Sequence, residues 1–173
     1  MRILTVRNPW AWAIIHAGKD VENRVRNIAG DYRGPVAIHA GLAFDADAHL
    51  TSASLRAAQD RAAVADGAEL YPGGYLWDIG APDPRRAWSV KGAIIGVVDL
   101  VDVHDRCWTA YAPRDGGDTV EEYCSDWAEP DTNHLELKNP RPLADPIPYK
   151  GALGLRRLDA ETIAKITAQI GGA

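Results

Sequence analysis

The segment from residue 91 to residue 103 constrains the fold more than any other part of this chain. It reads Lys-Gly-Ala-Ile-Ile-Gly-Val-Val-Asp-Leu-Val-Asp-Val, nearly all apolar at first and then alternating between apolar and polar residues. A continuous apolar run is typical of a strand buried on both faces, and alternation is typical of a strand with one face in solvent. We therefore expect one long strand that passes from the centre of a barrel to its rim.

Shorter segments with strand character lie on both sides of this one, separated by Gly and Pro. We expect them near residues 2–7, 20–26, 35–40, 134–138 and 152–157. Capping residues predict helices over residues 9–17 and 159–170, and Leu and Ala near helical spacing predict one over residues 45–66. The acidic residues 105–133 are expected to be a loop with a short helix near 120–128. Several short strands with a few helices predict an α+β fold, a small mixed β-barrel with peripheral helices.

Two local patterns refine this expectation. Asn8 and Pro9 suit the cap and the first position of the helix over residues 9–17. On that helix Trp10 falls on the core face, whereas Trp12 falls on another face and is left open between packing and binding. The prolines of residues 140–148 favour an extended segment outside a central sheet position.

Composition is that of an ordinary folded protein. The chain has 173 residues, 46% hydrophobic and 25% charged, which fits one domain over residues 1–173 with a helical and loop insertion at about 41–90. No apolar run approaches the ~20 residues of a membrane span. The first residues alternate like a strand and show no signal peptide, so we expect a cytoplasmic protein with no membrane partner.

Charge is distributed unevenly along the chain. The net charge is −5, yet residues 1–41 carry six basic side chains against three acids. Residues 99–136 hold eleven Asp or Glu and two Arg. A small basic patch can hold a few phosphates, whereas long duplex DNA requires many to be neutralised at once. A weaker alternative is that the acidic segment serves as a protein-interaction module.

The cysteines and acidic residues give little support for a metal. Cys107 and Cys124 are the only cysteines, and without a CxxC pair we expect them to be reduced and not to bind zinc. The run Asp99, Asp102, His104 and Asp105 is interpreted as a surface cluster at a strand end. Motifs for nucleotide phosphates, serine hydrolysis and zinc proteases are absent, so no metal and no cofactor are expected.

A polar group near the N-terminus is the candidate site. Lys19, Glu22 and Arg24 lie within one turn and the start of a strand, and Arg33 and His39 follow. One interpretation is a structural ion pair between Glu22 and an arginine. The other is a cleft in which an arginine meets a phosphate while Lys19 or Glu22 handles a base or a proton.

Aromatic residues near this group can stack on nucleic-acid bases or pack on the protein surface. Trp12 and Tyr32 are the first candidates, followed by Tyr71, Tyr75 and Trp77 in the insertion.

Three segments of the first forty residues carry a family resemblance. They are Leu-Thr-Val-Arg-Asn-Pro-Trp-Ala at 4–11, Gly-Lys-Asp-Val-Glu-Asn-Arg at 18–24 and Tyr-Arg-Gly-Pro-Val-Ala-Ile-His-Ala at 32–40. Lys-Gly-Ala-Ile-Ile-Gly at 91–96 and Asn-Pro-Arg-Pro-Leu at 139–143 add to it. Together they resemble the ASCH domains, relatives of the PUA RNA-binding fold. Leu135 departs from the family pattern, which often has Trp there.

The resemblance implies a PUA-like barrel with a cleft beside the first helix that binds RNA or a modified nucleotide. Some family members are amidohydrolases that deacylate N4-acetylcytidine, and others have been proposed as ribonucleases. Lys19 occupies the lysine position of the amidohydrolase pattern, while Glu22 replaces its threonine. Any enzyme activity would be metal-independent, with Lys19 and Glu22 as catalytic residues. The expected binding residues are Trp12, Lys19, Glu22, Arg24, Tyr32, Arg33 and His39.

Overall fold

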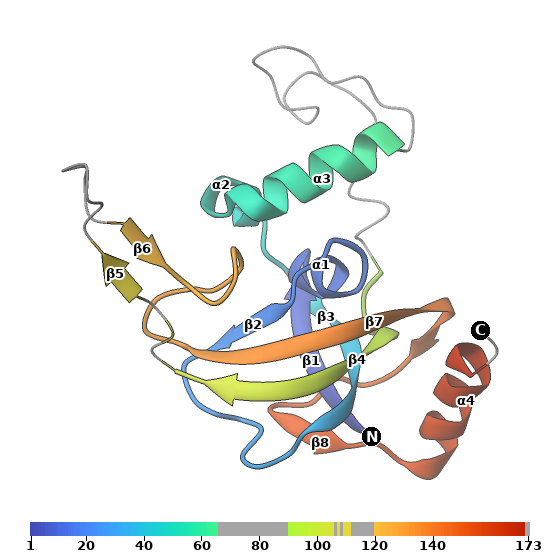
Figure 1. The fold of residues 1–173 in the computed structure, drawn as a ribbon. Coiled ribbons are helices and arrows are strands. Elements are labelled where there is room, and N and C mark those ends of the chain that lie inside the picture. The colour runs from blue at the N-terminus through green and yellow to red at the C-terminus, as the bar shows by residue number, and fades with distance from the viewer. Residues whose placement is uncertain (66–89, 106, 108, 112–119, 172–173) are drawn as a thin grey trace.

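A computed structural model describes residues 1–65, 90–105, 107, 109–111 and 120–171 (Figure 1). Its elements in chain order are β1 (Arg2–Asn8), α1 (Trp10–His16), β2 (Val21–Arg24), β3 (Gly34–Phe44), α2 (Ala48–Thr51), α3 (Ala53–Ala65), β4 (Ala93–His104), β5 (Thr109–Tyr111), β6 (Val120–Glu122), β7 (Asn133–Pro148), β8 (Leu155–Arg157) and α4 (Ala160–Ile170). Six strands form one sheet in the order β2-β7-β4-β3-β1-β8, and β5 pairs with β6 in a separate ribbon. The mixed α+β class is confirmed.

The expected long strand is confirmed as β4, which lies between β3 and β7 inside the sheet. It pairs antiparallel with both neighbours, while β1 runs parallel to β3. Residues 93–98 are buried, and exposure begins toward residue 104, where the strand reaches the rim. The change from a continuous apolar run to alternation therefore follows the passage of β4 out of the core.

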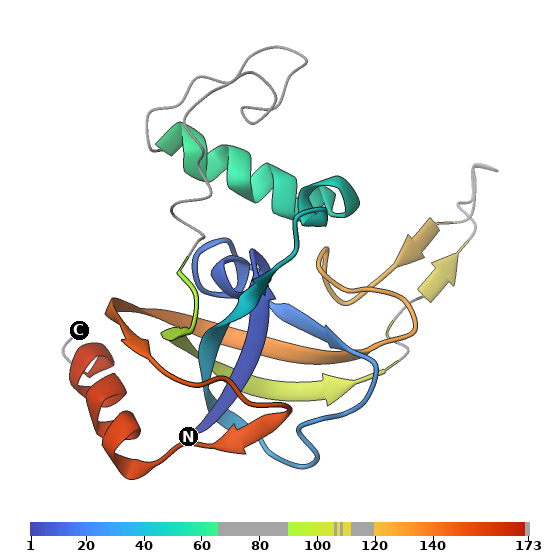
Figure 2. The same cartoon turned by 180° about the vertical axis from the view of Figure 1, so that it is seen from behind.

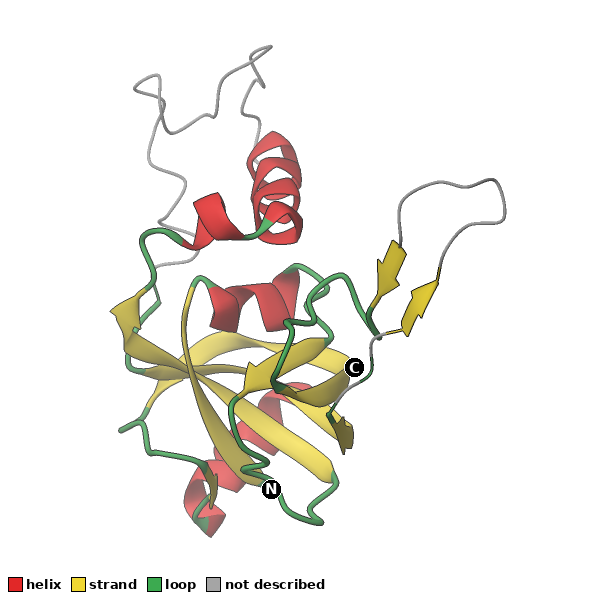
Figure 3. Ribbon diagram, turned by 90° about the vertical axis from the view of Figure 1, so that its left-hand side faces the viewer, coloured by secondary structure: helices red, strands yellow, loops and turns green. Residues whose placement is uncertain are grey.

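Each face of the sheet is covered by a different helix (Figure 3). On one face, α1 packs Ala11, Ile14 and Ile15 against strand residues such as Leu4 and Ile38. On the other, α4 packs its Ile166 against alternate residues of the same strands, Ile3, Ala37, Ile94 and Val97. The period-two alternation of β1 thus divides its side chains between the two cores. Figure 2 shows α4 from behind, beside the paired β1 and β8.

The expected closed barrel is not formed by the described residues, because β2 and β8 remain edge strands. Each edge strand is short and pairs with only part of its neighbour: β2 with residues 133–136, and β8 with residues 2–4. Where β2 approaches β1, Arg24 Nη2 donates a side-chain hydrogen bond of 3.1 Å to the carbonyl oxygen of Thr5. The sheet is therefore curved, and β1 and β2 come close enough for the Arg24 side chain to join them.

Of three local expectations, the one for the prolines was met in part and the other two were wrong. Asn8 does not cap α1: its Nδ2 donates to the carbonyl of Val90, and Pro9 occupies the N-cap. The prolines at 140–148 were expected in an extended segment outside a central sheet position. They are extended within β7, an inner strand by order, but β2 pairs only with residues 133–136, so the proline-rich half has one unpaired edge, where a missing N–H is tolerated. Residues 120–122 form strand β6 instead of a helix.

The helices over 9–17 and 159–170 are confirmed as α1 and α4. The Asp159 carboxylate caps α4 by accepting a 2.7 Å hydrogen bond from the N–H of Thr162. The insertion contains α2 and α3, and its aromatic candidates Tyr71, Tyr75 and Trp77 lie outside the described residues. Within the described part of the chain, no helix combines the length and apolar character needed to cross a membrane.

Candidate functional site

A polar cleft of about 200 Å³ lies where β1, α1 and β2 meet. Its lining residues are Thr5, Val6 and Arg7 of β1, Trp10 of α1, Lys19 before β2, Glu22, Asn23 and Arg24 of β2, and Glu129 from the segment before β7. Gly18 has a φ of +76°, a conformation that favours glycine and turns the chain sharply after α1. This turn brings Lys19 beside the start of β2, as the sequence predicted.

Lys19 is the central cation of the cleft. It is only 4% exposed, and its Nζ lies 5.3 Å from the ring centre of Trp10 and 5.5 Å from that of Trp127. Burial lowers the pKa of Lys19, since desolvation penalises the ammonium, while the nearby carboxylates of Glu22 and Glu129 act in the opposite direction. The ammonium is thus held by two indole rings and two carboxylates at intermediate range.

Glu22 and Arg24 form the floor of the cleft. Arg24 Nη2 lies 2.9 Å from Glu22 Oε1, and the Glu22 residue is 7% exposed. The same nitrogen donates to the Thr5 carbonyl of β1, whereas Arg24 Nε is buried without a hydrogen-bond partner among the described residues. The pair therefore links β2 to β1, as the structural interpretation expected, and also presents a buried donor; the functional interpretation stays a prediction.

The outer wall is a segment distant in sequence that the sequence analysis missed. Asn23 Nδ2 donates to the carbonyl of Trp127 at 2.8 Å, and Asn23 Oδ1 accepts from the N–H of Glu129 at 3.1 Å. Ser125 Oγ donates to the carboxylate of Asp20. These contacts join residues about a hundred positions apart, and no local pattern around residue 127 signals them.

Of the seven expected binding residues, Lys19, Glu22 and Arg24 are brought together in the cleft. The two tryptophans of α1 have exchanged their expected places: Trp12 is 7% exposed in a core shared with α2 and α3, and Trp10 lines the cleft. Trp12 is buried because α2 and α3 cover the face of α1 that carries it.

Tyr32, Arg33 and His39 are not among the residues that line the cleft. The Tyr32 hydroxyl donates to the carbonyl of Pro35, and its ring lies under the guanidinium of Arg2. Arg33 lies 3.3 Å from a carboxylate oxygen of Asp102. His39 is 2% exposed and its Nε2 lies 2.9 Å from the carbonyl of Tyr149. These interactions orient the three side chains within the fold, and their part in binding stays a prediction.

His39 is buried, and its ring has one bonded and one unbonded nitrogen among the described residues. Burial lowers the pKa of His39, although the hydrogen bond to the Tyr149 carbonyl favours the protonated form. Because a carbonyl only accepts, Nε2 carries the proton, and Nδ1 is buried without a partner among the described residues. The carbon Cε1 would lie 2.8 Å from a Cβ added at Gly151, so the ring is packed closely against that turn.

The cleft combines aromatic faces, a desolvated cation and carboxylates within a small volume. Such a set can stack a planar group, donate hydrogen bonds from Lys19 and Arg24, and accept them at Glu22 and Glu129. Perturbed ionisable groups in a cleft are typical of functional sites. Neither a family model nor a curated protein matches this chain, so the interpretation depends on the residues themselves.

Proposed function

We propose that the cleft binds a single nucleotide unit, in RNA or as a free modified nucleoside. The observation that carries this proposal is the position of Lys19, buried between the rings of Trp10 and Trp127 above the ion pair of Glu22 and Arg24. A base is planar and has donors and acceptors on its edge, which matches aromatic faces beside paired donors and acceptors. The volume of about 200 Å³ suits one nucleoside rather than a helix.

We further propose that the chain is an ASCH-type protein with a PUA-like fold. Two of the segments that carry the resemblance, residues 4–11 and 18–24, supply every lining residue of the cleft except Glu129. The third, residues 32–40, contains most of the first half of β3, which pairs with β1 behind the cleft. The residues that resemble the family are therefore the residues that build the candidate site.

Binding is tested by titrating cytidine, N4-acetylcytidine and short single-stranded RNAs while following tryptophan fluorescence. We expect Lys19→Met and Arg24→Ala to weaken binding by about 10- to 100-fold, the loss of one charge-assisted hydrogen bond. Lys165→Met and Arg156→Ala are matched controls on exposed surfaces, and both should bind like the wild type. Binding that survives Lys19→Met with unchanged affinity would place the ligand elsewhere.

A second candidate function is hydrolysis of an acylated base in the same cleft. It is favoured by the combination of a desolvated Lys19 with Glu22 at its side, since a lysine of lowered pKa can donate to a developing oxyanion or transfer a proton. Glu22 then activates a water, which attacks the amide carbon, and the amine leaves after protonation. No metal ion takes part in this reaction, and a ribonuclease reaction in the cleft would use the same two residues.

Turnover of N4-acetylcytidine to cytidine and acetate, followed by chromatography, tests this second function. We expect activity in the wild type and in Lys165→Met, and its loss in Lys19→Met and Glu22→Gln. Retention of full turnover in Glu22→Gln would exclude the water route through that carboxylate. Binding of the nucleoside without any turnover would leave the binding function alone.

A further inference from the structure

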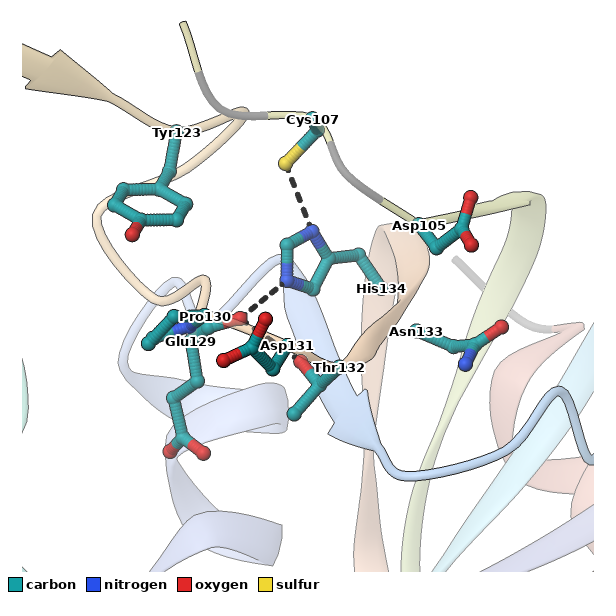
Figure 4. Close-up of a pocket in the computed structure, with 9 residues that line it drawn as sticks. All are labelled: Asp105, Cys107, Tyr123, Glu129, Pro130, Asp131, Thr132, Asn133 and His134. Carbon is teal, nitrogen blue, oxygen red and sulfur yellow. Dashed lines mark hydrogen bonds between the residues drawn. The ribbon is translucent and has the colours of Figure 1, made fainter. Parts of the chain in front are cut away.

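A second group of residues, outside the cleft, has the composition of a metal centre. It consists of His104 at the end of β4, His134 near the start of β7, and Cys107 and Cys124 from the connection between these strands. One ligand atom from each residue lies within 4.8 Å of the others. Cys107 Sγ is 2.9 Å from Nδ1 of His134 (Figure 4). Cys124 Sγ lies 3.4 Å from the same nitrogen. We call these four residues the Cys2His2 cluster.

In each histidine, one ring nitrogen interacts with an oxygen atom of a residue outside the cluster. His134 Nε2 lies 2.8 Å from the carbonyl oxygen of Glu129, which can only accept, so Nε2 carries the proton and Nδ1 presents a lone pair to the sulfurs. His104 Nδ1 lies 3.4 Å from the Asp102 carboxylate in the same way. Its Nε2 is buried and has no hydrogen-bond partner among the described residues. Metal-binding histidines are commonly oriented by such a carbonyl or carboxylate.

The four ligand atoms fit zinc. Bonds of about 2.0–2.3 Å place the corners of a zinc tetrahedron about 3.3–3.8 Å apart. The distance of 3.4 Å from Cys124 Sγ to His134 Nδ1 lies in this range, and the distance of 2.9 Å from Cys107 Sγ is shorter. A second group, Asp102, His104 and Glu136, is less suitable. Its two carboxylates are already paired with Arg33 and Lys138.

We propose that the Cys2His2 cluster is a structural zinc site. With four protein ligands the coordination is complete, as in structural rather than catalytic zinc centres. A disulfide between the cysteines would use the sulfurs but leave Nε2 of His104 buried without a partner. A cavity of about 210 Å³ beside Cys107 and His134 gives the ion a route of entry (Figure 4). The proposal does not depend on the function proposed for the cleft.

The cluster attaches Cys107 and Cys124, which lie between β4 and β7 in the chain, to the ends of these two strands. His104 and His134 are paired residues of β4 and β7, and the cysteines lie on the chain that leaves one strand and returns to the other. The stretch between Cys124 and His134 includes Trp127 and Glu129, the outer wall of the cleft. His134 bonds the Glu129 carbonyl directly. Zinc therefore fixes the backbone from which the wall of the cleft is built.

Metal analysis and cobalt titration test the site. Protein purified without chelator should contain one zinc per chain, measured by plasma mass spectrometry. The reduced, metal-free protein should bind one Co²⁺ with the visible absorption of a tetrahedral ion and a sulfur-to-cobalt charge-transfer band. Absence of both the zinc and the tetrahedral cobalt spectrum would overturn the assignment, as would an intramolecular disulfide in protein kept under reducing conditions.

Variants test each ligand and its support. Cys124→Ser should reduce the charge-transfer band, and Asp102→Asn should weaken cobalt binding by about 10- to 100-fold, the effect of losing the group that orients a ligand. His16→Gln, which alters an exposed histidine outside the cluster, should retain one equivalent. A cobalt spectrum that is identical in Cys124→Ser would contradict sulfur ligation.

A further test uses the wild-type protein with and without zinc, so that a variant that fails to fold cannot affect the result. Removing the ion with a chelator should speed hydrogen exchange of the backbone from residue 124 to residue 134, while β1 and β3 keep their protection. Zinc should also protect both thiols from an alkylating reagent. Equal alkylation and equal exchange with and without zinc would overturn the proposal.

Discussion

Lys19 keeps a cationic group in a position that exposes 4% of its surface. The fold tolerates this because two indole faces and several carboxylates surround the ammonium. A charge buried for stability alone would be costly, since an apolar side chain of the same length packs as well without desolvation. A buried Lys19 ammonium beside a polar cleft therefore agrees with a role in ligand binding.

The pH dependence of stability provides a test of this buried charge. The pKa of folded Lys19 is lowered, so between that pKa and the ordinary value of 10.5 the unfolded chain binds more protons than the folded chain. The free energy of unfolding contributed by this group therefore rises with pH across that interval. We expect wild type to gain stability relative to Lys19→Met as pH increases from 7 toward 10.5, measured by urea denaturation. A constant difference between the two proteins would contradict burial of the charge.

For single residues, the sequence predicted those cleft residues that are close to one another along the chain. Lys19, Glu22 and Arg24 are joined by one turn and one short strand, so their meeting follows from local geometry. Trp127 and Glu129 enter through hydrogen bonds to Asn23 across about a hundred positions. The exchange of Trp10 and Trp12 depended on which helix face α2 and α3 cover, and periodicity alone does not specify a partner.

Helix α1 packs closely against β4 at Gly96. A Cβ added at Gly96 would lie 2.6 Å from Ile15 Cδ1 and 2.9 Å from the carbonyl oxygen of Arg141. The absence of a side chain at this position of β4 lets the helix settle onto the sheet and supports the turn that presents Lys19. The glycine is a packing requirement here, because its φ is not in the left-handed region.

Gly96→Ala should consequently destabilise the protein by about 1–3 kcal/mol, the usual result of adding volume to a packed core. Ile15→Val alone should cost about 0.5–1.5 kcal/mol. The double variant should lose less than the sum of the two, because the shorter side chain relieves part of the overlap, although the Arg141 carbonyl still limits the space. Thermal unfolding of the four proteins measures this coupling, and strict additivity would argue against contact between the two residues.

Element types were predicted well where a long periodic pattern existed, as in β4 and α4. Closure of the sheet was not predictable, because it depends on whether β2 and β8 are long enough to pair with each other. The proposed zinc ligands were not among the expected site residues for a related reason. Counting cysteines ignored His104 and His134, which are 30 positions apart in sequence and become partners only once β4 pairs with β7.

For the whole molecule, the net charge of −5 limits what the cleft can attract. Its cations are Arg7, Lys19 and Arg24, and two of them already contact Asp45 or Glu22. Few phosphates can therefore be neutralised on binding. Recognition in such a site depends on the base and its contacts rather than on a field that spans the molecular surface.

The salt dependence of RNA binding measures how many phosphates are neutralised. With one or two phosphates contacted, the logarithm of the RNA association constant should fall by about 0.7–1.4 per logarithmic unit of salt. Fluorescence anisotropy of a short labelled RNA at several salt concentrations gives the slope, and a duplex DNA of equal length should bind more weakly. A slope steeper than about 3 would indicate a larger basic surface than the cleft provides.

The pairing of β1 with β8 has a consequence for synthesis of the protein. Leu4 is synthesised about 150 residues before its partner Leu155. At about 5–20 residues per second, the ribosome needs roughly 8–30 s to cover that interval. One side of β1 stays without a partner for this time, and an unpaired strand edge can associate with another nascent chain. A chaperone that covers this edge of β1 during synthesis should therefore raise the yield of folded protein.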